Sequence, residues 1–348
     1  MERDFKTTLK LYAQYAAART AAALLSAFPP EQNLVTAKLV ARLSIFLSPK
    51  RLARAVQHVA LAFPERDAAF HQTTAMRSIE HMLGLFMVDA LVMPRLITRR
   101  TWTQRVTLAP GFERALPYLQ SEKPCLFVTG HVGNWEILGY VLALVGVKMT
   151  ALARPLDNPY ISDWLFNIRE KSGLKILTKW GATEELQRVL ADGGKVGFIA
   201  DQNAGDDGLY VPSFGRLAST YKSIPLLAVH QSIPVICGYA RRVGGQFRYE
   251  LCTTDVILPS EWEGQEDPVF YVAARFNRAI ENMVRESPEQ NLWVHRRWKS
   301  RPKFEREGKP LPERLRAKLA ALPWMTDALL AELAQPLQPH SIPVAPLA

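Results

Sequence analysis

The stretch GHVGNWE, residues 130–136, holds the clearest candidates for chemistry in this chain. It follows the apolar run CLFVT and contains His131, Asn134 and Glu136. An imidazole can take a proton from a hydroxyl, and a carboxylate beside it can fix the tautomer and stabilise the imidazolium. On one continuous helix, a spacing of five residues is about 500° of rotation and puts the two side chains on different faces. His131 and Glu136 can therefore pair only if His131 lies in a loop before a helix that begins near Asn134, and Gly133 makes such a tight loop possible.

A second interpretation of the same stretch is a solvent-facing histidine, with Glu136 placed only to cap the helix. Other strand ends favour the chemical interpretation. Arg154 follows KMTALA, and Asp201 with Gln202 follows KVGFIA. In sheets of this kind, ligands bind beyond the carboxyl ends of the strands, so these side chains are expected at one rim with His131.

The elements that must position these residues follow from hydrophobic periodicity. Residues 1 to about 107 have a helical period, and strands and helices alternate from about residue 120. This pattern predicts an α/β fold, with a mixed, largely parallel central sheet flanked by helices and a helical N-terminal region. The predicted strands are 125–130, 148–154, 195–201, 234–242 and 247–254, and the predicted helices are 134–147, 182–194, 218–232 and 268–286.

The same pattern divides the chain into three parts. Residues 1–107 form a helical, membrane-associating region, residues 108–305 form the α/β domain, and residues 306–348 form a C-terminal helix with a loose tail over 335–348. No run reaches the roughly twenty apolar residues of a spanning helix. Residues 5–28 instead suggest an amphipathic helix that lies in a membrane interface, or else a surface helix packed on its own domain.

Composition points to an anionic partner without choosing one. The 348 residues include 43 basic and 33 acidic residues, for a net charge of +10. A phosphate-rich ligand, an acidic carrier protein, a lipid surface and nucleic acid all fit this charge. Three scattered cysteines, Cys125, Cys237 and Cys252, are too few for a disulfide framework and are expected to be reduced, small core residues.

The segment NLWVHRRWKSRP, residues 291–302, gathers Arg297, Lys299 and Arg301 around two tryptophans. A solvated basic face is the simpler interpretation. Tryptophans inside a cationic run also suggest a surface for phosphates or lipid head groups. We therefore expect residues 295–301 to face a bilayer together with the helix over 5–28.

Six motifs in order carry a resemblance to a known family. They are HVALAFPE, GHVGNWE, ARPLDNP, ADQNAG, VPSFGRLASTYKS and PEQNLWVHRRWKSRP. With them, the chain resembles the bacterial late acyltransferases of lipid A biosynthesis, within the glycerolipid acyltransferase-like superfamily. Two departures stand out: Arg19 interrupts an N-terminal helix that is more apolar in family members, and His58 stands where the family often has asparagine.

The resemblance implies an O-acyltransferase. His131 would be the catalytic base and Glu136 its charge partner in the HxxxxD/E motif of the family. Arg154 and Asp201 would be active-site residues. Substrate binding is expected from Asn134, Arg154, Asp201, Gln202, Arg297, Lys299 and Arg301.

The expected reaction moves an acyl chain from a thioester to a hydroxyl of a lipid A-like lipid at the cytoplasmic face of the bacterial inner membrane. Acyl carrier protein or acyl-coenzyme A would be the donor, and an anionic membrane surface a further partner. No metal, no cofactor and no nucleic acid is expected. The oxyanion would be stabilised by backbone amides near Gly133 or by Arg154. Two alternatives stay open: a different lipid acceptor, and a non-enzymatic basic membrane-binding protein.

Overall fold

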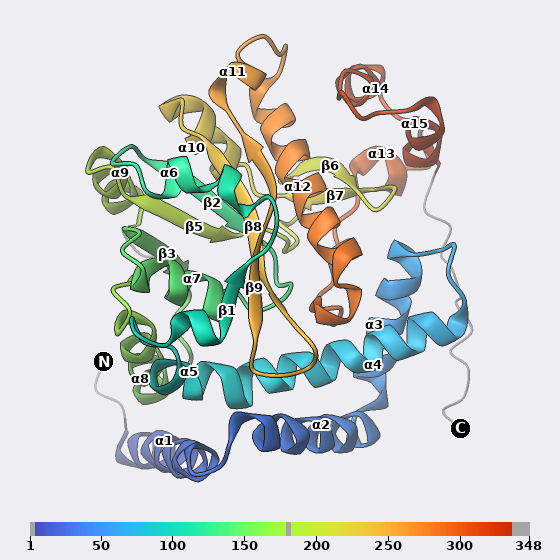
Figure 1. Ribbon diagram of the computed structural model, residues 1–348. Coiled ribbons are helices and arrows are strands. Elements are labelled where there is room, and N and C mark those ends of the chain that lie inside the picture. Colours follow the sequence, from blue (N-terminus) through green and yellow to red (C-terminus); the bar gives the residue numbers. More distant parts are fainter. Residues whose placement is uncertain (1–3, 179–181, 336–348) are drawn as a thin grey trace.

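Seven strands form the central sheet of the computed structural model, which describes residues 4–178 and 182–335 (Figure 1). Their order across the sheet is β1-β9-β8-β2-β5-β3-β4, and only β8 and β9 pair antiparallel. The predicted mixed, largely parallel sheet is confirmed. The strands are β1 Val106–Leu108, β2 Cys125–Thr129, β3 Met149–Ala153, β4 Lys175–Thr178, β5 Lys195–Ile199, β8 Val235–Arg242 and β9 Tyr249–Ile257.

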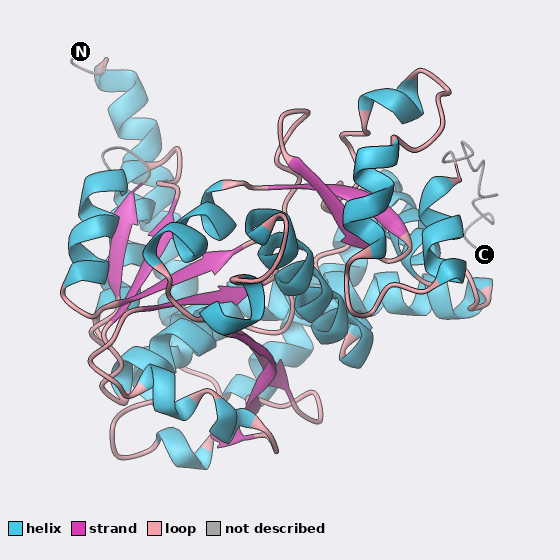
Figure 2. Ribbon diagram, turned by 90° about the horizontal axis from the view of Figure 1, so that it is seen from above, coloured by secondary structure: helices cyan, strands magenta, loops and turns pink. Residues whose placement is uncertain are grey.

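Helices cover both faces of the sheet, as Figure 2 shows. The alternation of side chains along β2 explains why. Leu126 and Val128 belong to one apolar core, and Cys125 and Phe127 belong to a second core. Helices α9 (Ala182–Ala191), α10 (Ser223–Gln231) and α12 (Pro268–Glu286) contribute to the first core, and α6 (Leu116–Leu119), α7 (Trp135–Leu144) and α8 (Pro159–Glu170) to the second.

The N-terminal region is helical, as predicted, and lies along one end of the sheet in Figure 1. Helices α2 to α5 share the two cores with the sheet, whereas Ala22 is the only residue of α1 that is buried. None of the helices in the described ranges is both long enough and apolar enough to cross a membrane. The elements are α1 Phe5–Ser26, α2 Pro30–Leu47, α3 Pro49–Ala62, α4 Ala68–Gly84, the π-helix η1 Leu85–Asp89 and α5 Ala90–Leu96.

Short elements complete the described chain. Near the sheet they are η2 Trp102–Gln104, η3 Phe112–Arg114, α11 Pro259–Trp262 and η4 Pro288–Gln290. The C-terminal part holds α13 Lys303–Arg306, α14 Glu313–Ala320 and α15 Asp327–Ala334. Apart from Gln335, the tail predicted to be loose lies outside the described residues.

The helix predicted over 218–232 is wrong in its first part. Residues Arg216–Thr220 form strand β7, which pairs antiparallel with β6, Leu209–Ser213, and the helix begins only at Ser223. The cause is the two-residue turn of Phe214 and Gly215, both with positive φ, a conformation that matches the twist of a β-hairpin. Helix α8 and strand β4 were not predicted. All three cysteines are buried and free, as expected.

Candidate active site

His131 and Asp201 meet at the carboxyl rim of the sheet. Strands β2 and β5 are adjacent, with Thr129 opposite Ile199, so each site residue lies two positions beyond the last matched pair. The Nδ1 atom of His131 lies 2.7 Å from Oδ1 of Asp201, and the His131 amide N–H donates to Oδ2 at 2.7 Å. The two side chains are 14% and 16% exposed, respectively. This pair is therefore largely shielded from water but open to one side.

The electrostatics of the pair leave one ring nitrogen free for chemistry. Burial raises the pKa of Asp201, but the charge and the two hydrogen bonds of His131 outweigh it and lower that pKa to about 2. Because the carboxylate is ionised and accepts from Nδ1–H, Nε2 of His131 carries the lone pair that can take a proton. The Nε2 amide nitrogen of Gln202 lies 3.5 Å from this atom.

Glu136 does not pair with His131, so the predicted contact is wrong. Its carboxylate instead accepts two hydrogen bonds from Arg169 of α8, at 2.7 and 2.6 Å. The charge of Glu136 raises the pKa of Arg169 against the opposing effect of burial. His131 does lie in a loop and Glu136 in the first turn of α7, as predicted, but that turn directs the carboxylate toward α8.

The loop between them is held from both sides. Gly133 has φ +63°, and a Cβ there would lie 2.2 Å from the carbonyl oxygen of Ala240, so only glycine fits. Its N–H donates to Gln290 at 3.0 Å, and the N–H of Asn134 donates to Ala240 at 2.8 Å. Asn134 caps α7 by accepting from the N–H of Ile137 and is 0% exposed. The predicted contact of Asn134 with substrate is therefore wrong for this structure.

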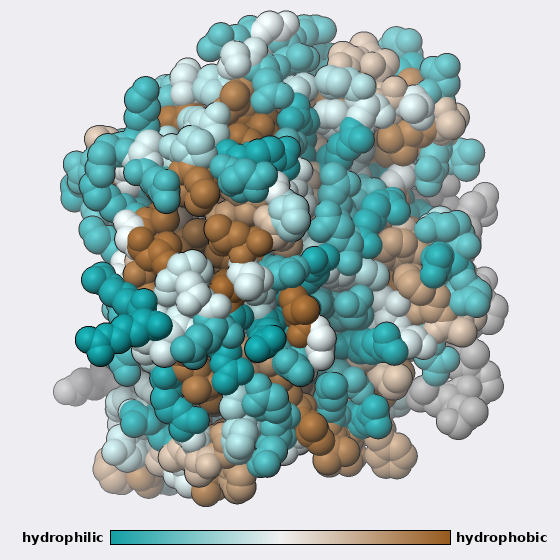
Figure 3. Space-filling model, viewed as in Figure 1, coloured by the Kyte–Doolittle hydropathy of each residue, from teal (hydrophilic) through white to brown (hydrophobic). Residues whose placement is uncertain are grey.

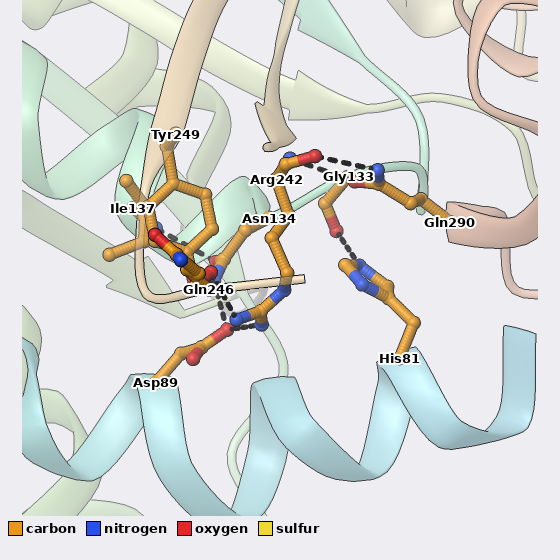
Figure 4. A network of polar contacts seen from close by, with 9 residues as sticks. All are labelled: His81, Asp89, Gly133, Asn134, Ile137, Arg242, Gln246, Tyr249 and Gln290. Atoms are coloured by element: carbon orange, nitrogen blue, oxygen red, sulfur yellow. Dashed lines mark hydrogen bonds and ion pairs between the residues drawn. The ribbon is translucent and has the colours of Figure 1, made fainter. Parts of the chain in front are cut away.

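A buried polar network lies behind the loop (Figure 4). Asp89, at the end of η1, accepts from Asn134 at 2.7 Å and from Arg242 of β8. His81 of α4 contacts the carbonyl oxygen of Gly133 at 2.9 Å, and burial lowers the pKa of His81 to about 3, so it is neutral and donates. Sequence reasoning missed His81, Asp89 and Arg242, because no local pattern links the N-terminal helices or β8 to the rim.

Aromatic rings surround the catalytic candidate. Trp135 lies edge-on to His131, with ring centroids 4.8 Å apart, and packs in turn against Phe86 at 6.0 Å. On another side, the His295 ring centroid is 5.0 Å from that of His131. The sequence signal for His295 was its place in the cluster WVHRRW, which we had assigned to a binding surface.

The basic cluster is mostly internal, which corrects that assignment. Trp293 and Trp298 are buried in the core. Burial lowers the pKa of Arg297 to about 10, and its guanidinium donates only to protein atoms. Its acceptors are the carbonyls of Gln202 and Ser219 and the side chains of Thr220 and Asn277.

The guanidinium of Arg301 also donates to acceptors within the protein. It forms a bidentate pair with Glu305 and donates to the carbonyl of Leu217 at 2.5 Å. Both guanidinium groups thus have acceptors within the protein, and the predicted binding of an anion by Arg297 and Arg301 stays a prediction. Lys299 and Arg154 are exposed, and within the described ranges their side chains make no hydrogen bond or ion pair, so these two of the four predicted cations face solvent.

These features define a class: an α/β protein with a histidine–carboxylate pair at the strand-end rim, suited to proton transfer. Comparison with known proteins identifies it further. The family model for the bacterial lipid A biosynthesis acyltransferase matches residues 3–300, so the chain belongs to this family of acyltransferases.

The relatives agree with this assignment at low identity. The chain is 27% identical over 263 residues to a lipid A biosynthesis lauroyltransferase of Escherichia coli, covering 73% of this chain and 81% of the relative. It is 24% identical over 296 residues to lipid A biosynthesis acyltransferase 2 of Shigella flexneri, covering 82% and 90%. A lipid A biosynthesis palmitoleoyltransferase of Escherichia coli is also 24% identical, over 264 residues, covering 73% and 80%.

Proposed function

We propose that this protein transfers a fatty acyl chain from an acyl thioester to a hydroxyl of a lipid A-like acceptor. The observation that carries the proposal is the hydrogen-bonded pair of His131 and Asp201 at the sheet rim. The donor is acyl carrier protein or acyl-coenzyme A, and the three relatives, named for different acyl chains or for none, leave the chain length open.

The chemistry follows from the free Nε2 of His131. This nitrogen takes the proton of the acceptor hydroxyl as the oxygen attacks the thioester carbonyl. Asp201 holds the ring in that tautomer and stabilises the imidazolium. The tetrahedral oxyanion then collapses, the C–S bond breaks, and the imidazolium returns its proton to the leaving thiolate. The products are the ester and the free thiol, without an acyl-enzyme.

A membrane-facing surface on α1 and α2 fits a lipid acceptor. On α2, the side chains of Val35, Leu39, Leu43 and Phe46 are 57%, 61%, 57% and 79% exposed. These positions lie within roughly 80° of one another around the helix, so they form one apolar stripe. Figure 3 shows apolar residues along the lower edge of the molecule, where these helices lie.

Helix α1 also exposes apolar residues, but they are spread around the helix and form no stripe, so the predicted amphipathic character of residues 5–28 is wrong. On α1, Phe5, Leu9, Tyr12 and Leu24 are exposed, among Lys6 and Lys10. We call the exposed apolar residues of α1 and α2 the α1–α2 face. Burial of such residues at a bilayer interface and attraction of cations to anionic lipid reinforce each other. This surface supports attachment to one leaflet. In this proposal α2 faces the bilayer beside α1, instead of residues 295–301.

The test is acyl transfer by purified protein, measured by mass spectrometry of a lipid A precursor in vesicles with acyl-carrier protein or acyl-coenzyme A. We expect His131→Ala to slow transfer by about 10² to 10⁴ while the protein stays folded, because it removes the base. His230→Ala, at an exposed position of α10, is the matched control and should leave the rate unchanged. Transfer by folded His131→Ala protein at the wild-type rate would overturn the proposal.

A further inference from the structure

The reaction in the preceding subsection needs hydrogen-bond donors for the oxyanion, and the expected ones are already in use. The amides of His131, Gly133 and Asn134 donate to Asp201, Gln290 and Ala240, respectively. Val132 is 0% exposed, so its amide cannot meet a substrate. The predicted oxyanion donors near Gly133 are therefore committed to the fold.

The basic side chains do not replace them. The guanidinium of Arg297 already donates hydrogen bonds to acceptors within the protein. Arg154 follows β3, which is separated from β2 by β5, so it starts one strand farther from His131 than Asp201 does. The candidates that remain are the first-turn amides of α7 and the side chains beside the reactive nitrogen of His131.

Two side chains lie beside the His131 ring, those of Gln202 and His295. Gln202 points its amide nitrogen at Nε2 of His131 across 3.5 Å, a long contact that an incoming hydroxyl would displace. His295 presents its ring with centroids 5.0 Å apart, and within the described ranges its ring nitrogens make no side-chain hydrogen bond.

Backbone hydrogen bonds hold the segment of His295 beside the loop that carries His131. Val132 and Asn291 form an antiparallel bridge, and the N–H of Leu292 donates to the carbonyl of His131 at 2.9 Å. The N–H of His295 closes the following turn on Leu292 at 3.1 Å. These backbone contacts fix the positions of the two histidines relative to each other. Such preorganisation is what an oxyanion site requires.

The charge state of His295 suits a donor rather than a base. Burial lowers its pKa, and the neighbouring charge of His131 lowers it further against the opposing effect of Asp201. A neutral imidazole still carries one N–H, which can polarise a carbonyl without repelling the imidazolium that forms on His131.

We propose that His295 and Gln202 donate the hydrogen bonds that stabilise the thioester oxyanion. This inference rests on the proposed acyl transfer and assigns His295 a catalytic role. His131 takes the proton on one side of the reacting carbon, and the two donors hold its oxygen on the other.

The test compares donor-keeping and donor-removing variants. Removal of one oxyanion donor slows turnover by about 10² to 10³. We expect His295→Leu and Gln202→Leu each to lower kcat by that factor with little change in KM for the acyl donor, and His295→Gln to recover part of the loss through its amide N–H. His58→Gln is the matched control, because His58 and His295 line one cavity but the His58 ring already donates a hydrogen bond to the carbonyl of Trp293.

A binding measurement separates this role from a structural one. The acceptor hydroxyl adds to the carbonyl carbon of a trifluoromethyl ketone analogue of acyl-coenzyme A, and when His131 takes its proton the hemiketal oxygen carries the negative charge. An S-alkyl thioether analogue has no carbonyl. His295→Leu and Gln202→Leu should weaken binding of the ketone at least tenfold and leave the thioether unchanged. Should His295→Leu fail to fold, His295→Gln and Gln202→Leu carry the same comparison.

The outcomes are distinct. Near wild-type kcat in folded His295→Leu and Gln202→Leu would overturn the inference and place the oxyanion at the first-turn amides of α7. Equal weakening of the ketone and thioether analogues would also overturn it, since that result reports shape and not oxyanion binding. If the wild-type protein transfers no acyl chain at all, it is the proposed function that fails.

Discussion

Asp201 accepts from both the ring and the backbone of one histidine, and so fixes where His131 stands as well as how it is turned. Neutralising this carboxylate should disturb the tautomer of His131 and remove the charge that stabilises its imidazolium. Glu136, by contrast, supports Arg169 and touches His131 in no hydrogen bond among the described residues.

These contacts predict opposite results for two carboxylates. Asp201→Asn should slow acyl transfer by about 10² to 10⁴, and the folded protein should persist. Glu136→Gln should lower the thermal unfolding temperature by unpairing Arg169, while transfer per folded molecule stays within about tenfold of wild type. Transfer rates corrected for the folded fraction check this. If Glu136→Gln abolished transfer while Asp201→Asn left it near the wild-type rate, Glu136 and not Asp201 would be the partner of His131.

The lowered pKa of Asp201 predicts a pH dependence of stability. Its folded pKa of about 2 lies below its ordinary value of 3.8, so the pair stabilises the fold above about pH 4. As pH falls from about 4 to about 2, the carboxylate gains its proton and roughly 2 kcal/mol is lost. The difference in unfolding free energy between wild type and Asp201→Asn, from urea titrations in detergent, should shrink over this range. A difference that stays constant would contradict the linkage.

At the scale of elements, the loop that carries His131 depends on an ion pair between η1 and β8. Asp89 is 0% exposed and the side chain of Arg242 is 7% exposed, and the same carboxylate also accepts from Asn134 at the start of α7. The π-helical turn of η1 ends at Asp89, and Figure 4 shows Asp89 and His81 pointing from the N-terminal helices toward this loop. The N-terminal helices therefore support the site directly, in addition to any role at a membrane.

A double-mutant cycle tests this support. Arg242→Met or Asp89→Leu alone should destabilise the fold by about 3–5 kcal/mol, because each leaves a buried charge unpaired. The double variant should lose less than the sum of the two. The same cycle at Lys309 and Glu307, an exposed pair, should give less than about 1 kcal/mol. Additive losses at the buried pair would show that the two residues act independently.

At the scale of the whole molecule, the α1–α2 face lies at one end of the sheet, on the side of the N-terminal helices (Figure 1). Phe86, which is 53% exposed on η1, packs on Trp135, and Trp135 packs on His131. A row of aromatic rings thus leads from the surface near these helices to the ring of His131. This arrangement suits an acceptor whose acyl chains stay in a bilayer while its hydroxyl reaches the rim.

Flotation with anionic vesicles tests the α1–α2 face. Leu43→Glu with Phe46→Glu should weaken binding at least about tenfold, because burial of such side chains contributes about 1.5–3 kcal/mol each. High salt should also weaken the binding of the wild-type protein, because salt screens the attraction of its cations to anionic lipid. Leu226→Glu is the control, since Leu226 is 50% exposed on α10, away from this face in Figure 1. Unchanged binding in the α2 variant would remove α2 from the membrane surface.

Local pattern in the sequence was enough to predict the α/β class, most strands, the helix over 268–286 and the loop that carries His131. These features depend on the alternation of apolar residues and on turn residues such as Gly133, which act over a few positions. The order of the six motifs was likewise enough to suggest the family that the comparisons then confirmed.

Only the tertiary structure decided which partner each charged residue has. Asp201 meets His131 because β5 lies beside β2, and adjacency between strands is a long-range property that the spacing of seventy residues does not encode. Arg297 and Arg301 turn inward because carbonyls of β7 accept from both of them, and the carbonyl of Gln202, after β5, accepts from Arg297 as well. Periodicity reports whether a segment is helix or strand, whereas the burial of a cation depends on acceptors brought from elsewhere in the chain.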